Sequence, residues 1–386
     1  MTTDTTPADH GRPVLGVEDP AELLAQTRLS LAGPPTDCLI LAGRPEAGAA
    51  AMITSSPLHE LLGPSGVSSL RRHLALMHER GSAAVHALIV LGDGHQRLLD
   101  TVVEDILRRA GAAVHEAARD AGGEGGTLLE VHGAASASCW SVQHLPGPQG
   151  GGEVRITACG PLREFADTRV AATAVLQGRP IPQVDAHGDA LREIGRALEL
   201  PPADLASAAD PGALFATARA ALAPLLLEAG RLSAQDRMTK CEQVAALLSA
   251  VAVDRLHWEL LAQCVERGAS RRIDRETLLQ HLVSDGEWTP HPDVCAGGDW
   301  YVGLERLRSI AAAARTEGAA SQRGTARSAW RALTALLVLL AWWNHRFATA
   351  GGLVDQLREE EPESTLAPLL SRMTDTPIFP AWWPSP

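Results

Sequence analysis

The segment Ala84-Val-His-Ala-Leu-Ile-Val-Leu91 decides the fold of the N-terminal half of this chain. A short apolar run of this kind, with one polar position, is typical of a strand that is buried on both faces of a sheet. The preceding segment, 67–80, places Leu70, Leu74 and Met77 at spacings of four and three residues. This spacing predicts an amphipathic helix that packs on the sheet.

The neighbouring segments continue the alternation of strand and helix. A helix is predicted over 96–110 and a strand over 128–132, whereas a short helix over 19–31 precedes apolar runs at 37–42 and 50–54. Strands and helices that alternate at these lengths favour right-handed crossovers and a largely parallel sheet. The residues of the helix over 96–110 that should face the sheet are Leu99, Val103, Ile106 and Ala110.

Two more apolar segments, 139–144 and 153–158, flank a Gly/Pro-rich stretch and predict a loose hairpin. A helix should follow over 165–177 and end at Gly178. After residue 186 the strand patterns stop. The helices predicted in the second half cover 189–198, 211–228, 234–264, 274–283, 300–316, 325–346, 350–360 and 364–373.

The sequence therefore predicts an α/β N-terminal domain with a mainly parallel or mixed sheet, followed by an all-α C-terminal helical domain. The length of 386 residues exceeds what one core usually supports, so two domains are expected. We expect a disordered leader over 1–18, the α/β domain over 19–185 and the helical domain over 186–386. The last should end in a tetratricopeptide-like hairpin and a docked tail with Trp382 and Trp383, the alternative being an exposed, partner-binding tail.

Charge and hydropathy exclude some classes of partner. The formal net charge is −12 and the basic pairs are scattered, which argues against binding to nucleic acid or anionic lipid. The strongest apolar segment, 332–343, is too short to span a bilayer, and Met1–Pro13 lacks the pattern of a secretory signal. We expect a soluble cytoplasmic protein with no membrane contact. Its oligomeric state stays open.

The loop Gly92-Asp93-Gly94-His95 is the first candidate for a functional site. It follows the predicted strand over 84–91, at the edge where open α/β sheets bind ligands. It is not a dinucleotide-binding motif, because Arg97 stands where the third glycine would be. Two interpretations remain: a tight turn in which Asp93 helps to cap the next helix, or a loop that faces a ligand.

Thiols and possible metal ligands form two weaker groups. The six cysteines include no CxxC pair, so buried free thiols are expected, with catalysis by Cys139 or Cys159 as the alternative. His144 joins these two as a thiol or metal candidate. In the second half His291, Asp293 and Cys295 are close in sequence, which fits either a surface connection between helices or a metal loop. No metal is predicted and no cofactor is identified.

Several short blocks together resemble an actinobacterial family, the one known as domain of unknown function 4192. In the first half they are Leu23-Leu24, Pro34–Leu41, Trp140-Ser141, Cys159-Gly160-Pro161 and Thr168–Gly178. In the second half they are Ala341-Trp342-Trp343, Gly351–Leu357, Glu361-Pro362 and Leu366–Leu370. His144 and Gly160 stand where family members often carry further cysteines. The resemblance implies a bacterial intracellular protein from a family without an established activity.

The absence of an assembled catalytic motif favours a binding or scaffold protein with a possible protein partner. The alternative is an enzyme of unknown reaction, hydrolytic or nucleotide-related, with its site at the carboxyl edge of the sheet around Gly92–His95. A purely structural role is a third hypothesis. A pocket with converging polar side chains at that edge would favour the enzyme, whereas a filled or flat edge would favour binding.

Overall fold

The structure is a computed structural model of the whole chain, and it divides into two compact units. The first comprises Met1–Val184 with Pro384–Pro386, and the second comprises Asp185–Trp383. The residues that the structure describes are 18–31, 35–45, 52–121, 127–146, 152–178, 188–200, 213, 216, 234–265, 273–295, 299–375 and 378–383.

Some predicted features lie outside the described residues. They include the leader up to residue 17, the turn over 147–151 and nearly all of the helix over 211–228.

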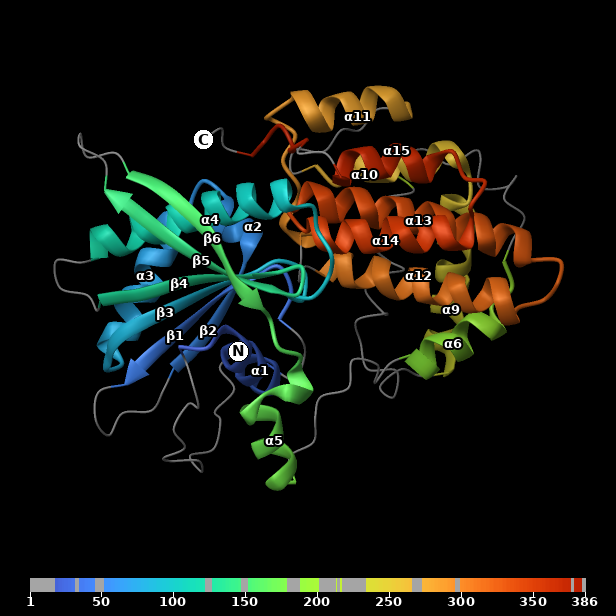
Figure 1. Ribbon diagram of the computed structural model, residues 1–386. Coiled ribbons are helices and arrows are strands. Elements are labelled where there is room, and N and C mark those ends of the chain that lie inside the picture. The colour runs from blue at the N-terminus through green and yellow to red at the C-terminus, as the bar shows by residue number, and fades with distance from the viewer. Residues whose placement is uncertain are drawn as a thin grey trace. The chain divides into compact units, whose positions relative to one another are not determined.

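The first unit contains a six-stranded mixed sheet, as the sequence predicted (Figure 1). The strand order is β2-β1-β3-β4-β5-β6. Only β3 and β4 pair in parallel, whereas the other neighbouring strands are antiparallel. The mixed alternative is therefore the correct one. The strands are β1 Cys38–Pro45, β2 Met52–Pro57, β3 Ser82–Val90, β4 Thr127–Ala135, β5 Ser138–Pro146 and β6 Gly152–Pro161.

Helices cover both faces of this sheet. On one face α1 packs over a cluster that includes Ile40, Leu88 and Ala134. The opposite face carries the amphipathic helix, whose Leu70, Leu74 and Met77 are buried as predicted, beside a longer helix. The helices of the unit are α1 Pro20–Ser30, α2 Leu58–Leu62, α3 Gly66–Glu79, α4 Asp100–Ala121, the 3-10 turn η1 Phe165–Asp167 and α5 Arg169–Leu176.

The helix α4 begins four residues later than the sequence predicted. The Ser136 hydroxyl accepts a hydrogen bond from the Leu98 N–H at 2.9 Å and donates one to the Leu98 carbonyl at 3.2 Å. These bonds replace the helical hydrogen bonds of Leu98. The prediction that Leu99 faces the sheet is wrong, because its side chain is 47% exposed. Val103, Ile106 and Ala110 are buried, which confirms the rest of that face.

The second unit is helical, as the sequence predicted. Its described residues form no strand, and one isolated bridge joins Val265 and Pro290. Its central helix α13 is buried along most of its length, including Trp342 and Trp343. The helices are α6 Gly188–Ala197, α9 Ala234–Val251, α10 Asp254–Gln263, α11 Arg275–Ser284, the 3-10 turn η3 Pro292–Val294, α12 Asp299–Glu317, α13 Arg323–Trp343, α14 Phe347–Glu360 and α15 Leu366–Asp375.

The last described residues contact the carboxyl end of α13. The Trp382 indole donates a hydrogen bond to the Trp343 carbonyl at 3.1 Å, and the Trp383 ring lies 3.7 Å from that of His345. The Trp342 indole in turn donates to the Ile378 carbonyl. No helix among the described residues is both long and apolar enough to cross a membrane.

Gly111 allows α4 to approach the sheet, and its substitution tests this packing. A Cβ atom at this position would lie 2.4 Å from Val142 Cγ1. We expect Gly111→Ala to destabilise the protein by about 1–3 kcal/mol because of overpacking. In α14, where Gly352 has open space around it, Gly352→Ala should instead stabilise by about 0.5–1 kcal/mol. Urea denaturation measures both effects, and a stable Gly111→Ala variant would contradict the close approach.

Candidate functional site

A buried carboxylate fixes the loop that follows β3. Asp37 is 2% exposed and precedes β1, whose start pairs with the end of β3. Its side-chain Oδ1 accepts a hydrogen bond from the Gly92 N–H at 2.7 Å, and its own N–H donates to the Gly92 carbonyl at 2.8 Å. The carboxyl edge predicted from the sequence is therefore held in place by a residue that lies 55 positions earlier in the chain.

The two glycines of the predicted loop shape the turn. Gly92 has φ 58° and Gly94 has φ 89°, a region that side-chain-bearing residues rarely occupy. A Cβ atom at Gly94 would also lie 3.0 Å from Leu162 and 3.3 Å from Leu24. Neither glycine lines the nearby pocket, so both serve the backbone conformation.

Asp93 and His95, in contrast, line a pocket. Asp93 Oδ1 accepts hydrogen bonds from the backbone N–H groups of His95 and Gln96, each at 2.9 Å. Asp93 thus caps this turn and not α4, which begins only at Asp100. The loop is therefore a tight turn, as the first interpretation has it, but Asp93 does not cap the next helix. Asp93 and His95 also line the pocket, and that they face a ligand stays a prediction.

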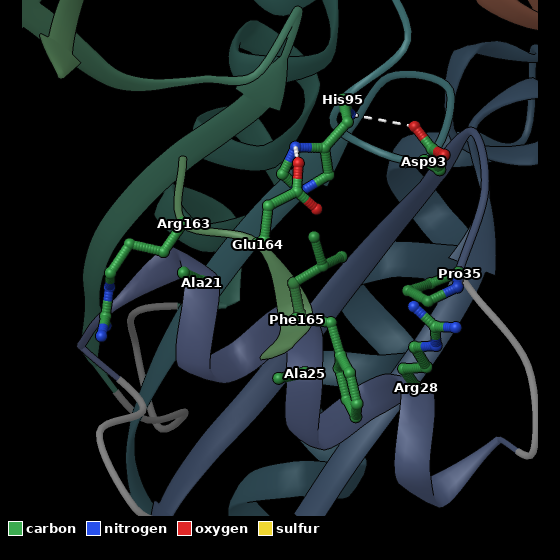
Figure 2. Close-up of a pocket in the computed structure, with 10 residues that line it drawn as sticks. Ala21, Ala25, Arg28, Pro35, Asp93, His95, Arg163, Glu164 and Phe165 are labelled. Carbon is green, nitrogen blue, oxygen red and sulfur yellow. Dashed lines mark hydrogen bonds and ion pairs between the residues drawn. The ribbon is translucent and has the colours of Figure 1, made fainter. Parts of the chain in front are cut away.

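The pocket lies beside α1 and has a volume of about 140 Å³ (Figure 2). Its walls come from α1, the loop after β3 and the segment that follows β6. The lining is mixed: α1 contributes apolar residues and Arg28, and the other segments contribute charged residues together with Pro35 and Phe165. The lining residues are Ala21, Leu24, Ala25, Arg28, Pro35, Asp93, His95, Arg163, Glu164 and Phe165.

The side chains of His95 and Glu164 lie within ion-pair distance of each other in this pocket. His95 Nδ1 lies 3.3 Å from Glu164 Oε1, and Figure 2 shows the two side chains pointing toward each other. The imidazole is 23% exposed, whereas the carboxylate is mostly exposed. A carboxylate in this position orients the imidazole ring.

Arg163 forms ion pairs with two acidic residues at the start of α1. Its guanidinium pairs with Asp19 and lies 3.2 Å from Glu22 Oε1. Glu22 is fully buried and also accepts hydrogen bonds from the N–H groups of Arg169 and Val170, at 2.9 and 3.0 Å. Burial by itself raises the pKa of Glu22, but these two N–H groups and Arg163 outweigh it, so the pKa lies below its ordinary value. Glu22 therefore joins α1 to the start of α5 as a carboxylate.

Arg28 is a cation of the pocket for which the described residues offer no acidic partner. Its guanidinium carbon lies 4.7 Å from the centre of the Phe165 ring. Among the described residues no carboxylate pairs with it, and its buried Nε has no hydrogen-bond partner. A ring-stacked guanidinium keeps its N–H edges available for an anion.

The thiol and histidine candidates of the first unit are not brought together. Cys139 packs against the apolar cluster under α1, and burial, followed by the charge of Asp19, raises the pKa of its thiol to about 11. Such a thiol is a poor nucleophile at neutral pH. Cys159 is exposed on the adjacent strand. His144 lies beside α4, where its Nε2 is 3.0 Å from the Arg119 guanidinium.

The predicted group in the second unit connects two helices. Cys295 Sγ donates a hydrogen bond to the Asn344 side chain, which itself donates to the Val294 carbonyl. His291 Nδ1 accepts from the Asp293 N–H at 3.2 Å. These contacts tie the segment to the carboxyl end of α13. Within the described ranges no three His, Cys, Asp or Glu side chains gather in a way that could hold a metal ion.

Sequence reasoning missed most of the pocket. Arg28 and Glu22 belong to a helix in which buried Glu22 and Thr27 interrupt the apolar periodicity, so no face stood out. Glu164 and Phe165 come from a short turn with no recognisable motif. The one usable signal was acidic Glu22 within an otherwise apolar helix start, because a buried carboxylate needs a partner.

The buried carboxylate of Glu22 predicts a pH-dependent contribution to stability. Because its pKa is lowered on folding, the contribution is complete above the ordinary value of 4.5 and is lost as the pH falls through the lowered value. At neutral pH Glu22→Gln should reduce the free energy of unfolding by about 1.5–3 kcal/mol. The difference from the wild type should shrink below pH 4.5.

Urea denaturation at neutral pH and at lower pH measures this effect. Exposed Glu79 at the end of α3 provides the matched control, since Glu79→Gln should change stability little at either pH. A Glu22→Gln difference that stays constant with pH would contradict the role of the charge.

Comparison with known proteins gives no match: no family model, no curated protein and no solved structure matches this chain. The site is therefore interpreted from its own geometry.

Proposed function

We propose that this protein is a binding protein whose first unit accepts an acidic side chain of a protein partner in the pocket beside α1. The observation that carries the proposal is Arg28, a guanidinium that stacks on Phe165, lines the pocket and has no acidic partner among the described residues. Arg28 is partly buried, and an incoming carboxylate can bind its guanidinium through two parallel hydrogen bonds.

The size and lining of the pocket support one side chain in preference to a whole metabolite. Small-molecule sites usually have volumes of roughly 300–1,000 Å³, whereas this pocket measures about 140 Å³. Leu24 and Ala25 offer an apolar wall for the methylene groups of a glutamate, and Arg28 lies about one helical turn away for its carboxylate.

The contacts of two other polar residues also favour binding over catalysis. Asp93 accepts hydrogen bonds from backbone N–H groups of the turn, and Arg163 forms ion pairs with Asp19 and Glu22. Among the residues that the structure describes, no serine, threonine or cysteine lines the pocket. We also propose, on the resemblance described above, that the chain belongs to the actinobacterial domain of unknown function 4192 family and acts in the cytoplasm. Its free cysteines fit a reducing compartment.

Titration with a glutamate analogue tests the proposed pocket. N-acetyl-glutamate amide should shift the backbone NMR signals of Gly94 and His95 saturably, whereas the neutral glutamine analogue should not. Arg28→Gln should weaken the binding at least tenfold, because it removes the charge-assisted pair. The control is Arg72→Gln, at an exposed position of α3, which should bind like the wild type. Equal shifts with both analogues, or with Arg28→Gln, would contradict the proposal.

An enzyme is the second candidate, and the pair of His95 and Glu164 favours it. An imidazole oriented by a carboxylate can act as a general base toward a water molecule. We expect no hydrolysis of p-nitrophenyl acetate or bis-p-nitrophenyl phosphate beyond the rate of the His95→Gln variant. Turnover by the wild type that both His95→Gln and Glu164→Gln abolish would instead establish the enzyme.

A further inference from the structure

A second and larger cavity lies within the helical unit. Its volume is about 500 Å³, inside the usual range of small-molecule sites. The helix α12 forms its floor, where Ala312 and Ala313 leave space, and α6, α13 and α14 contribute the walls. The lining residues are Arg192, Arg308, Ser309, Ala312, Ala313, Arg315, Thr316, Glu317, Trp330, Gln356, Glu359 and Glu360.

Two arginines of α12 stack on one buried tryptophan in this cavity. Arg308 and Arg315 are two helical turns apart and therefore share a face of the helix. Their guanidinium carbons lie 5.5 and 4.0 Å from the centre of the Trp330 ring, and Trp330 is 2% exposed. Contact with the ring fixes the planes of both guanidinium groups, so their N–H edges are preorganised.

The two guanidinium groups carry more positive charge than the carboxylate that pairs directly with them. Arg308 donates to two neutral acceptors, the Thr334 hydroxyl at 2.8 Å and the Gln356 side chain. Arg315 lies 3.1 Å from Glu360, but its buried Nε has no hydrogen-bond partner among the described residues. Burial is the main cause that lowers the pKa of Arg308, and the charge of Arg315 adds to it, whereas Glu305 and Glu360 act in the opposite direction.

Two further carboxylates that line the cavity form no direct ion pair with Arg308 or Arg315. Glu317 pairs with Arg196 of α6, and Glu359 forms no ion pair within 4 Å among the described residues. A ligand that brings two negative charges to Arg308 and Arg315 would satisfy both. A carboxylate carries one charge on two oxygens, whereas a phosphate monoester carries close to two on three oxygens.

We propose that the cavity between α6, α12, α13 and α14 binds a small phosphate monoester, whose phosphate group lies between Arg308 and Arg315. A phosphate ion alone would leave most of the volume empty, so the ester carries a polar body. Ser309, Thr316 and Gln356 line the cavity. The two hydroxyls donate to carbonyls of α12, so their oxygens are left to accept from hydroxyl groups of such a body. This inference is independent of the pocket beside α1, which belongs to the other unit.

Isothermal titration calorimetry with the full-length protein tests the inference, with glucose 6-phosphate, glucose and inorganic phosphate as probes. The monoester should bind at least tenfold more tightly than either of the other two. Arg308→Gln and Arg315→Gln should each weaken its binding at least tenfold. Arg358→Gln, an exposed position on α14 that pairs with Asp355 outside the lining, is the matched control and should leave binding unchanged.

A conservative variant guards against a folding defect. Arg308→Lys keeps the charge, so it should retain more binding than Arg308→Gln if the charge is recognised, and circular dichroism should show helical content equal to that of the wild type for both. Equal affinity for glucose and its phosphate would overturn the proposal. Monoester binding that neither glutamine variant changes would place the ligand elsewhere and would also overturn it. Inorganic phosphate binding as tightly as the ester would contradict the monoester.

Discussion

The first unit depends on the buried carboxylate of Asp37. This residue adopts a left-handed backbone conformation, φ 44°, which costs about 1 kcal/mol or more outside glycine. Three hydrogen bonds offset that cost: two join it to Gly92, and its carbonyl accepts the Leu58 N–H at the start of α2. One side chain before β1 thereby sets the loop after β3 and the entry into α2. The loop that this junction positions supplies Asp93 and His95 to the wall of the pocket beside α1.

Arginine stacked on an aromatic ring recurs in both units. Arg28 lies over Phe165 in the first, and Arg308 and Arg315 lie over Trp330 in the second, where Arg346 also lies over Tyr301. Lys240 is the one lysine in the sequence, so nearly all cationic side chains are guanidinium groups. A planar cation can be held by a ring and still present its edge to an anion, which an ammonium group does less well. Both proposed sites use this geometry.

The sequence predicted the parts of the fold that follow from local periodicity. The strand over 84–91 is β3, the face of Leu70, Leu74 and Met77 packs as expected, and the apolar segment 332–343 is the core of α13. Features set by distant residues could not be predicted. The start of α4 depends on the bonds of Leu98 with Ser136, 38 residues further along the chain, and the pocket combines α1 with residues 163–165. The position of Asp93 and His95 just after β3 could be predicted because strand ends follow from local periodicity, whereas Arg28 had no signal of its own.

The contact of Glu22 with Arg163, Arg169 and Val170 has a consequence for the order of events during synthesis. Glu22 leaves the ribosome 141 residues ahead of Arg163, an interval of roughly 7–30 s at usual elongation rates. Throughout that time the first helix carries a carboxylate whose partners have not been translated. The helix can settle on the nascent sheet only at the cost of a lone charge in an apolar setting. Completion of the first unit therefore waits for the segment that starts α5, and a chain stalled before it would keep its first helix undocked.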